Sequence, residues 1–403
     1  MDSTRYITNK RPLYWLAAGT FAVGTESFMI AGLLPGMAQD LGVSVGTAGQ
    51  LVTVFALAYA LGSPLLATLT GHINRRKLLI GAMSAFAAAN VLAFAASGYW
   101  SLMAARVLLA LTAAMYVPGA NALASVVVPP EQRGRAIAIV NGGLSLAIAL
   151  GVPAGAVLGG ALGWRATFGS VAILAALAVA GLLRGLPRGI GTGLATATLR
   201  QRVATAAQPA VLVTLLVTML WAMASYTTYT YLAPLLDATT IVHGTAIGFV
   251  LFAWGVSAAI GLAISGPAVD RKGPRAVVLP ALATSTTAFI VLSLVAHFAG
   301  RHFAIVPVAF AIAAWGIAHW AFYPAQQTTL VGVAGIAAAP VALSLNASFM
   351  YLGFSLGAAL GSLTLRYSSL SNLGFVSALC AGAALALAGA FGVRPAPQAH
   401  RSH

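Results

Sequence analysis

The sequence has 403 residues, of which 60% are hydrophobic and only 7% are charged. So few charges cannot cover a soluble surface, and apolar runs of about 20 residues, long enough to cross a bilayer, recur along the chain. The net charge of +15 does not indicate a nucleic-acid partner, because the basic residues lie between the apolar runs and not in one module.

These runs predict an all-α membrane protein with twelve spans. The apolar part of the first run continues to about Leu34, too long for a cleaved signal peptide, so we interpret it as a span. The predicted spans are 13–36, 48–69, 78–97, 100–122, 136–162, 166–186, 209–235, 245–268, 276–297, 303–325, 340–364 and 371–392.

Arginine and lysine positions predict the orientation, since cytoplasmic loops carry an excess of both. With the N-terminus inside, 17 of the 21 fall on the cytoplasmic side. Arg165, Arg301 and Arg366 fall outside, and Arg106 lies within a span. Both termini are therefore expected in the cytoplasm.

The longest loop divides the chain. Residues 187–208 are basic and rich in glycine, threonine and alanine, which predicts a cytoplasmic linker between an N-terminal bundle (1–186) and a C-terminal bundle (209–403). The GIGTG in this loop is not a phosphate-binding loop, because no strand precedes it. Cys380 lies in an apolar run and is expected to be a packing residue.

Span five carries small residues every four positions. Glycine costs about 1 kcal/mol in a helix interior, whereas in a bilayer a small-residue stripe lets a second helix approach to near backbone contact. The stripe comprises Gly143, Ala147, Gly151, Gly155, Gly159 and Gly163, with Pro153 in the middle. The four-residue spacing of Gly151, Gly155 and Gly159 recurs 202 positions later at Gly353, Gly357 and Gly361, which indicates two structural repeats.

Two loops support the repeat. TGHINRRKLL (70–79) joins spans two and three, and VDRKGPRAVV (269–278) joins spans eight and nine. An offset of 199 aligns Arg76 with Arg275. Because each half has an even number of spans, we expect parallel repeats, arranged as two pseudo-symmetric six-helix bundles.

Glu26 is the one acid that these spans place well inside the membrane. Intramembrane carboxylates usually face a cavity and serve an ion or a substrate. Arg106 in span four lies at a similar depth. Desolvation favours the protonated carboxyl and a neighbouring arginine favours the charged one, and the sequence leaves open which effect is larger.

These segments resemble the major facilitator superfamily, and within it the drug and sugar efflux branch of proton antiporters. VDRKGPR is similar to the family's cytoplasmic loop motif, RVLLALTAAMYVPGANA to its fourth-span motif with a buried arginine, and ALGVPAGAVLGG to its fifth-span antiporter motif. YPAQQTTLV and PVALSLNASFMYLGFSLGAALG resemble the arabinose efflux permease group.

The resemblance assigns roles by motif. It implies a gating motif at Arg75, Arg76, Asp270, Arg271, Gly273 and Arg275. It implies a helix-packing antiporter motif at Gly151, Pro153, Gly155, Gly159 and Gly160. Gly71 and His72 stand where the family usually has Asp and Arg, so the Asp270 cluster is expected to carry more of the gating.

In this family spans one and four line the cavity, so contact between Glu26 and Arg106 is expected to couple protons to solute. Polar and aromatic side chains in the cavity spans are candidate substrate contacts, although helix packing also explains each of them singly. They are Tyr116, Asn121, Trp221, Tyr226, Tyr229, Trp315, His319, Trp320, Tyr323, Gln326, Gln327, Asn346 and Tyr351.

The predicted function is export of a small organic solute, sugar-like or drug-like, in exchange for protons. Proton symport, facilitated uptake and a non-transporting receptor remain alternatives. The sequence has no HExxH or GxSxG motif, which argues against an enzyme, and we predict no cofactor or metal. The expected partners are the solute, protons and lipid, and we expect a functional monomer in a bacterial inner membrane.

Overall fold

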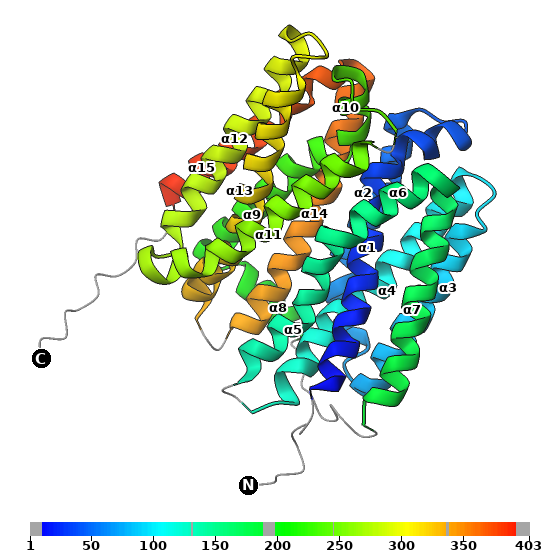
Figure 1. The fold of residues 1–403 in the computed structure, drawn as a ribbon. Helices are drawn as coiled ribbons and strands as arrows, with labels where there is room; N and C mark the ends of the chain where they lie inside the picture. Colours follow the sequence, from blue (N-terminus) through cyan, green and yellow to red (C-terminus); the bar gives the residue numbers. More distant parts are fainter. Residues whose placement is uncertain (1–9, 130–131, 188–197, 245, 336–337, 392–403) are drawn as a thin grey trace, which may run out of the picture.

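The structure, a computed structural model, describes residues 10–129, 132–187, 198–244, 246–335 and 338–391. This part of the chain is helical, and it contains twelve helices long and apolar enough to cross a membrane. The predicted all-α, twelve-span fold is therefore confirmed (Figure 1). Most of the expected linker, including its GIGTG, and the terminal segments placed in the cytoplasm lie outside the described residues.

The first six spans occupy one side of the molecule in Figure 1. They are α1 (Arg11–Asp40), α2 (Val45–Leu69), α3 (Arg75–Phe94), α4 (Tyr99–Val126), a fifth span built from α5 (Arg133–Leu146), η3 (Ala147–Gly151) and α6 (Val152–Leu162), and α7 (Trp164–Gly185). Asn74 starts α3 by accepting hydrogen bonds from the backbone N–H groups of Arg76 and Lys77.

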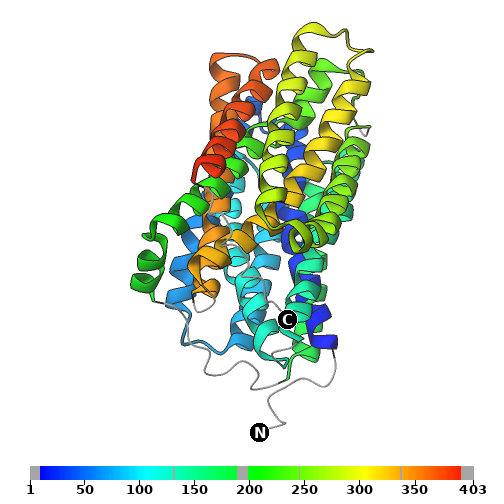
Figure 2. The same cartoon turned by 90° about the vertical axis from the view of Figure 1, so that its left-hand side faces the viewer.

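The last six spans lie beside the first set, and Figure 2 shows them from their own side. They are α9 (Pro209–Tyr229) with α10 (Leu232–Thr239), α11 (Ala246–Lys272), α12 (Arg275–Phe298), α13 (Ile305–Ala334), α14 (Ala339–Tyr367), and α15 (Leu373–Phe391), which follows the short helix η4 (Leu370–Asn372). The short α8 (Leu199–Ala206) precedes α9 and packs on α14 and α9.

Two boundaries differ from the sequence prediction. The sequence predicts a continuous span seven over 209–235, but α9 ends at Tyr229 and α10 begins at Leu232. Between them the Tyr231 hydroxyl donates to the Ala358 carbonyl oxygen at 2.9 Å, which fixes the chain at the break. The VDRK segment, predicted as loop, forms the end of α11, because the helix ends only at Gly273, whose φ is +79°.

The small-residue stripe of span five packs against α1. A Cβ on Gly143 would come within 2.1 Å of the Ala17 carbonyl oxygen, and one on Gly151 within 2.1 Å of Thr25 Oγ1. Further along, Gly159 contacts Leu33. The partners advance along α1 as the glycines advance along span five, so the two helices run parallel at near backbone contact.

A π-helical turn in the middle keeps this stripe aligned. A four-residue repeat drifts around an α-helix of 3.6 residues per turn. The segment Ala147–Gly151 is a π-helix, whose wider turns take more residues and offset part of the drift. The stripe therefore follows α1 over several turns.

The repeated stripe on α14 packs on α9 in the same way. Cβ atoms on Gly353 and Gly357 would come within 2.3 Å and 2.4 Å of the carbonyl oxygens of Met219 and Met223. Gly361 faces the Thr227 carbonyl oxygen and the Tyr231 ring. Each half therefore joins its first and fifth spans through glycine, as expected of structural repeats.

The two sets of spans meet mainly through α2 and α14, and through α11 and span five. Side-chain hydroxyls also join the sets. Ser355 Oγ donates to the Thr53 carbonyl oxygen at 2.9 Å, Ser362 Oγ to that of Gly46 at 3.0 Å, and Tyr229 to that of Phe28 at 3.4 Å. The Ser362 contact lies where α2 begins and α14 ends, so that end of the interface is closed.

Candidate functional site

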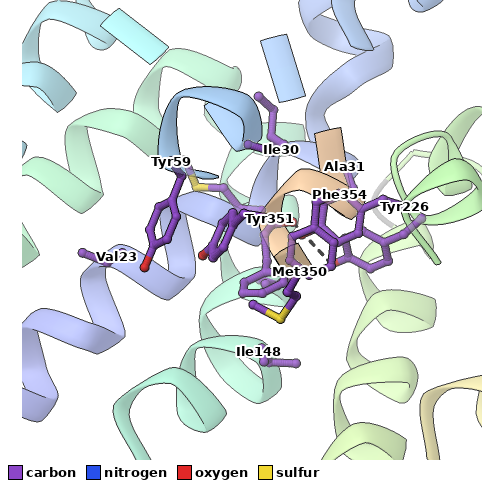
Figure 3. Packing of buried hydrophobic residues seen from close by; sticks show 14 of the residues in the cluster. Val23, Ile30, Ala31, Tyr59, Ile148, Tyr226, Met350, Tyr351 and Phe354 are labelled. Carbon is purple, nitrogen blue, oxygen red and sulfur yellow. Dashed lines mark hydrogen bonds between the residues drawn. The ribbon is translucent and has the colours of Figure 1, made fainter. Parts of the chain in front are cut away.

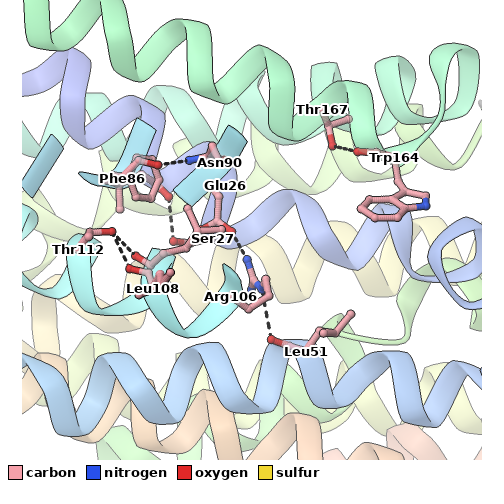
Figure 4. A network of polar contacts seen from close by, with 12 residues as sticks. Glu26, Ser27, Leu51, Phe86, Asn90, Arg106, Leu108, Thr112, Trp164 and Thr167 are labelled. Atoms are coloured by element: carbon pink, nitrogen blue, oxygen red, sulfur yellow. Dashed lines mark hydrogen bonds and ion pairs between the residues drawn. The ribbon is translucent and has the colours of Figure 1, made fainter. Parts of the chain in front are cut away.

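Glu26 and Arg106 form an ion pair in the interior of the first half. Arg106 Nη1 donates to Glu26 Oε1, and neither side chain is exposed to solvent (Figure 4). Glu26 lies near the middle of α1, where the stripe of span five fixes the opposite face of the helix. The structure thus brings the two predicted residues into direct contact.

Arg106 is held on two further sides. Its Nε donates to the Leu51 carbonyl oxygen of α2 at 3.3 Å, and its guanidinium carbon lies 4.1 Å from the centre of the Phe55 ring. One oxygen of the pair, Glu26 Oε2, and one nitrogen, Arg106 Nη2, have no hydrogen-bond partner among the described residues. The pair is therefore fixed in place but retains one acceptor and one donor for another group.

Most of the predicted aromatic residues gather in the second half, on α9 and α13. The Trp221 ring stacks on His319 at 4.1 Å between ring centres and on Tyr323 at 5.8 Å. Tyr229 and Trp315 lie 6.2 Å apart, and Tyr226 lies 5.6 Å from Tyr229. These residues form one aromatic cluster.

A hydrogen-bond chain orients His319 in this cluster. Trp315 Nε1 donates to Ser225 Oγ at 3.3 Å, and Ser225 Oγ lies 2.7 Å from His319 Nδ1. The Ser225 hydroxyl has one proton and two acceptor lone pairs, so it can accept from the indole and still either donate to His319 Nδ1 or accept from it. In both cases the chain fixes the orientation of the imidazole ring.

Aromatic side chains also bridge the two halves. Tyr59 of α2 stacks on Tyr351 of α14 at 3.6 Å, and Figure 3 shows the two rings side by side. Phe28 of α1 makes edge contacts with Tyr226 and Phe354, and those two rings stack at 3.7 Å. Phe28 lies two residues after Glu26, so the ion pair and the aromatic cluster are joined through α1.

Trp254 and Trp320 also belong to the cluster, because both rings contact His319, and three indole nitrogens of the cluster lack a partner within the described part of the chain. Trp221, Trp254 and Trp320 have buried Nε1 atoms without a hydrogen-bond partner among the described residues. Asn346 on α14 accepts from Thr218 at 2.8 Å and keeps its Nδ2 unpaired. Buried polar groups are normally satisfied, so these donors are candidate ligand contacts.

Other predicted residues lie elsewhere. Tyr116 donates to the Leu16 carbonyl oxygen at 3.2 Å inside the first half, and Asn121 donates to Asn141 at 3.1 Å between α4 and α5. Gln326 donates to the Thr214 carbonyl oxygen at 2.8 Å, one helical turn along α13 from Tyr323 of the aromatic cluster. Gln327 is half-buried next to it.

Sequence reasoning missed several members of the site. Tyr59, Phe28, Trp254 and Phe354 each make ring contacts with predicted residues. Tyr59 offered a signal as a polar aromatic residue in a predicted span. Trp254 offered the same signal through its indole N–H, whereas Phe28 and Phe354 are apolar and only the packing distinguishes them from ordinary core residues.

The two motif arginines that the repeat aligns bind equivalent positions. Arg76 donates to the carbonyl oxygens of Leu186 and Leu183 at the end of α7, at 2.8 Å and 2.9 Å. Arg275 donates to the Gly389 carbonyl oxygen in the last turn of α15 at 2.8 Å. Each therefore satisfies carbonyls at the end of the sixth span of its own half, where a cation is favourable.

The other residues of the gating motif lie at the start of α3 and at the end of α11. Arg75 is buried at the start of α3, and Asp270 and Arg271 are exposed at the end of α11, before Gly273. In the antiporter motif, Gly151 and Gly155 are buried against α1, Pro153 is also buried, Gly159 is half-buried and Gly160 is exposed. The described residues contain no group of three potential metal-binding side chains.

Comparison of the sequence with known proteins identifies its family. The sequence profile of the Major Facilitator Superfamily matches residues 16–358. The chain is similar to the Inner membrane transport protein YdhP of Escherichia coli O157:H7, with 35% identity over 93% of this chain and 94% of the relative. It is also similar to a Chloramphenicol resistance protein of Streptomyces lividans, with 34% identity over 65% of this chain and 67% of the relative.

A solved structure supports the fold. A mutant of the peptide transporter POT in complex with alafosfalin superposes with a TM-score of 0.76, covering 94% of each chain at 13% sequence identity. The sequence match and this agreement of twelve-span architecture lead to one conclusion. The chain belongs to the major facilitator superfamily and is a multi-pass membrane transporter, not an enzyme.

Proposed function

We propose that this transporter exports a small organic solute in exchange for protons. The observation that carries the proposal is the buried Glu26–Arg106 pair with its unpaired Oε2. A proton or a donor group of the solute can occupy that oxygen, but not both at once. Mutually exclusive binding at one carboxylate is the condition for exchange.

The aromatic cluster supports an aromatic solute that carries hydrogen-bond acceptors. Stacked rings suit a planar body, and the unpaired nitrogens of Trp221, Trp254 and Trp320 suit acceptor oxygens. Chloramphenicol combines an aromatic ring with hydroxyl and amide groups, and one relative is named for resistance to it. It is therefore the first compound to test, with sugars as the second class.

One observation favours proton symport as the second candidate. Arg106 Nη2 is also unpaired. A solute acceptor that drew Arg106 away from Glu26 would leave a buried carboxylate, which would take up a proton. Solute and proton would then bind together. The two candidates differ in which member of the pair the solute engages.

We further propose how the pair reaches each side of the membrane. Residues 1–186 and 209–403 act as two bundles that rock about it, joined by 187–208, with both termini in the cytoplasm and the monomer as the working unit. The closed end, where Ser362 meets Gly46, then faces outward. Arg76 and Arg275 hold the cytoplasmic ends of their bundles during this motion. The relative named an inner membrane transport protein supports a bacterial inner membrane.

The direction of proton movement distinguishes these candidates. Purified protein is reconstituted into vesicles loaded with chloramphenicol or a sugar and containing a pH-sensitive dye, and the vesicles are then diluted. Exchange predicts that the lumen becomes more acidic as the solute leaves. A lumen that becomes more alkaline would establish symport, and solute efflux without a pH change would contradict proton coupling.

A further inference from the structure

The second half contains a cavity apart from the ion pair and the aromatic cluster. Its volume is about 570 Å³, and it lies among α9, α12, α13 and α15, which pack on one another (Figure 1). Its walls carry Val213, Val217, Val278, Leu279 and Val333. Ligand pockets in proteins measure roughly 300–1,000 Å³, so this cavity suits a single small molecule.

At the corresponding position the first half has a larger side chain. The repeat offset of 198 between the starts of α1 and α9 aligns Trp15 with Val213. Trp15 packs on α7, where Cβ atoms on Gly181 and Gly185 would come within 2.0 Å and 2.4 Å of its indole ring. The second half has Val213 on one side and Ala388 and Phe391 on the other. The smaller valine accounts for the open space.

Each half has a side-chain hydrogen bond between its first and fourth spans, at the inner end of the region that the cavity occupies. Tyr116 donates to the Leu16 carbonyl oxygen in the first half, and Gln326 donates to that of Thr214 in the second. The same offset of 198 relates Leu16 to Thr214. The first and fourth spans of each half are thus joined at equivalent positions. The cavity exists because the side chains of the second half fill less of the space beside this hydrogen bond.

The lining is cationic at one edge and mostly apolar elsewhere, with Thr214, Gln326, Thr328 and Thr329 as its uncharged polar side chains. Lys272 and Arg275 are the charged residues of the lining, and both carry positive charge. Gly273, Pro274 and Arg275 place the first turn of the 24-residue helix α12 at the same edge, where a helix favours an anion. The exposed Asp270 does not line the cavity.

We infer that this cavity binds an anionic amphiphile, with its headgroup at Lys272 and Arg275 and one of its apolar chains between α9 and α13. Basic pockets between membrane helices on the cytoplasmic side bind anionic headgroups.

A ligand bound in this cavity would affect the candidate solute site through α9 and α13, which carry residues of both sites. The Gln326–Thr214 bond joins these helices beside the cavity, and Thr218 and Trp221 follow on the next turns of α9. Because α9 and α13 belong to the same bundle, an occupant between them would act on the positions of Trp221 and Tyr323 in the solute site, and not on the rocking of the two bundles. The site would therefore be regulatory.

Equilibrium binding of radiolabelled dodecanoate to the full-length protein in phosphatidylcholine nanodiscs tests the inference. Val213→Trp places in the cavity the indole that the first half has at this position, and we expect at least a tenfold loss of affinity. Leu212→Trp, on the neighbouring, more exposed face of α9, is the matched control and should bind as the unmodified protein does.

The headgroup is tested separately. Lys272→Gln should weaken dodecanoate binding several-fold and leave binding of dodecanol unchanged, whereas Arg271→Gln, outside the lining, should change neither. Dodecanol binding as tightly as dodecanoate would overturn the anionic headgroup site. Unchanged dodecanoate binding by Val213→Trp would also overturn the proposed site. If that variant does not fold, unchanged dodecanoate binding by Lys272→Gln would overturn it instead.

Nanodiscs that contain phosphatidylglycerol distinguish the source of the ligand. Lower dodecanoate binding in them would identify a membrane lipid as the competing occupant of the anionic site. Unchanged binding would identify a free fatty acid as the ligand of the same site. Neither result depends on the protonation of Glu26, so failure of this inference leaves the proposed exchange untouched.

Discussion

Glu26 and Arg106 each depend on the other being charged. Removing one partner of a buried ion pair leaves an uncompensated charge in a poorly solvated interior, which is far more costly than removing both. Arg106 also binds the Leu51 carbonyl oxygen and the Phe55 ring, so it is positioned even when Glu26 is neutral. The arginine is thus the fixed member of the pair, and the glutamate is the member suited to exchange a proton.

The variant Arg106→Gln is expected to be destabilised by about 3–5 kcal/mol, because Glu26 then lacks its cation. The double variant Glu26→Gln/Arg106→Gln should recover most of that loss, since two amides can hydrogen-bond without a buried charge. Thermal unfolding of the purified variants measures both effects. Losses that simply add in the double variant would show that the two residues do not stabilise each other.

Span five acts at the scale of the element by fixing α1. Its glycines replace side chains that would collide with Ala17, Thr25 and Leu33. This contact sets both the rotation and the depth of α1, and therefore directs Glu26 toward α4. Thr20 adds a direct link, since its hydroxyl donates to the Val140 carbonyl oxygen at 2.6 Å.

Gly151→Ala tests this contact. Its added Cβ would lie 2.1 Å from Thr25 Oγ1, and overpacking of this kind typically costs about 1–3 kcal/mol. Gly142→Ala in the same span is the matched control, because its Cβ meets nothing within 4 Å. We expect a lower unfolding temperature for the first variant only. Equal stability of the two variants would contradict the packing role of the stripe.

At the scale of the whole molecule, the two halves are joined at one end. Ser362 donates to the Gly46 carbonyl oxygen, and Gly49 leaves room for the Tyr231 hydroxyl, which a Cβ would approach to 2.0 Å. The stack of Tyr59 on Tyr351 continues the interface inward. Transport by alternating access requires these contacts to separate.

A disulfide across this interface tests that requirement. With Cys380 replaced by Ser, the pair Gly46→Cys and Ser362→Cys places two thiols where a Cβ on Gly46 lies 3.4 Å from Ser362 Oγ. Oxidation should reduce transport at least tenfold, and reduction should restore it, while each single cysteine variant remains active. Full transport by completely cross-linked protein would contradict the account of the closed end.

The fold was predictable because span length, charge bias and repeated glycines are local properties of the sequence. The depth of Glu26 and Arg106 could be estimated from helix geometry, but their contact depends on helix rotation, which span five sets through packing. The break at Thr230 and Tyr231 was missed although Pro234 marks it, since a proline cannot donate to the carbonyl oxygen four residues earlier, that of Thr230, and its ring crowds that carbonyl. The hydrogen bond from Tyr231 to Ala358 then fixes the chain at the break. The cavity beside Val213 was equally invisible, since it appears only when the two halves are compared in space.

The proposed exchange depends on one carboxyl group, that of Glu26, to couple protons to solute. Glu26→Gln in reconstituted vesicles tests it most directly, with Asp237→Asn, an exposed acid, as the matched control. We predict that Glu26→Gln still exchanges labelled for unlabelled solute across the membrane, but no longer accumulates solute or moves protons when a pH gradient is imposed. Undiminished pH-driven transport by Glu26→Gln would contradict the account.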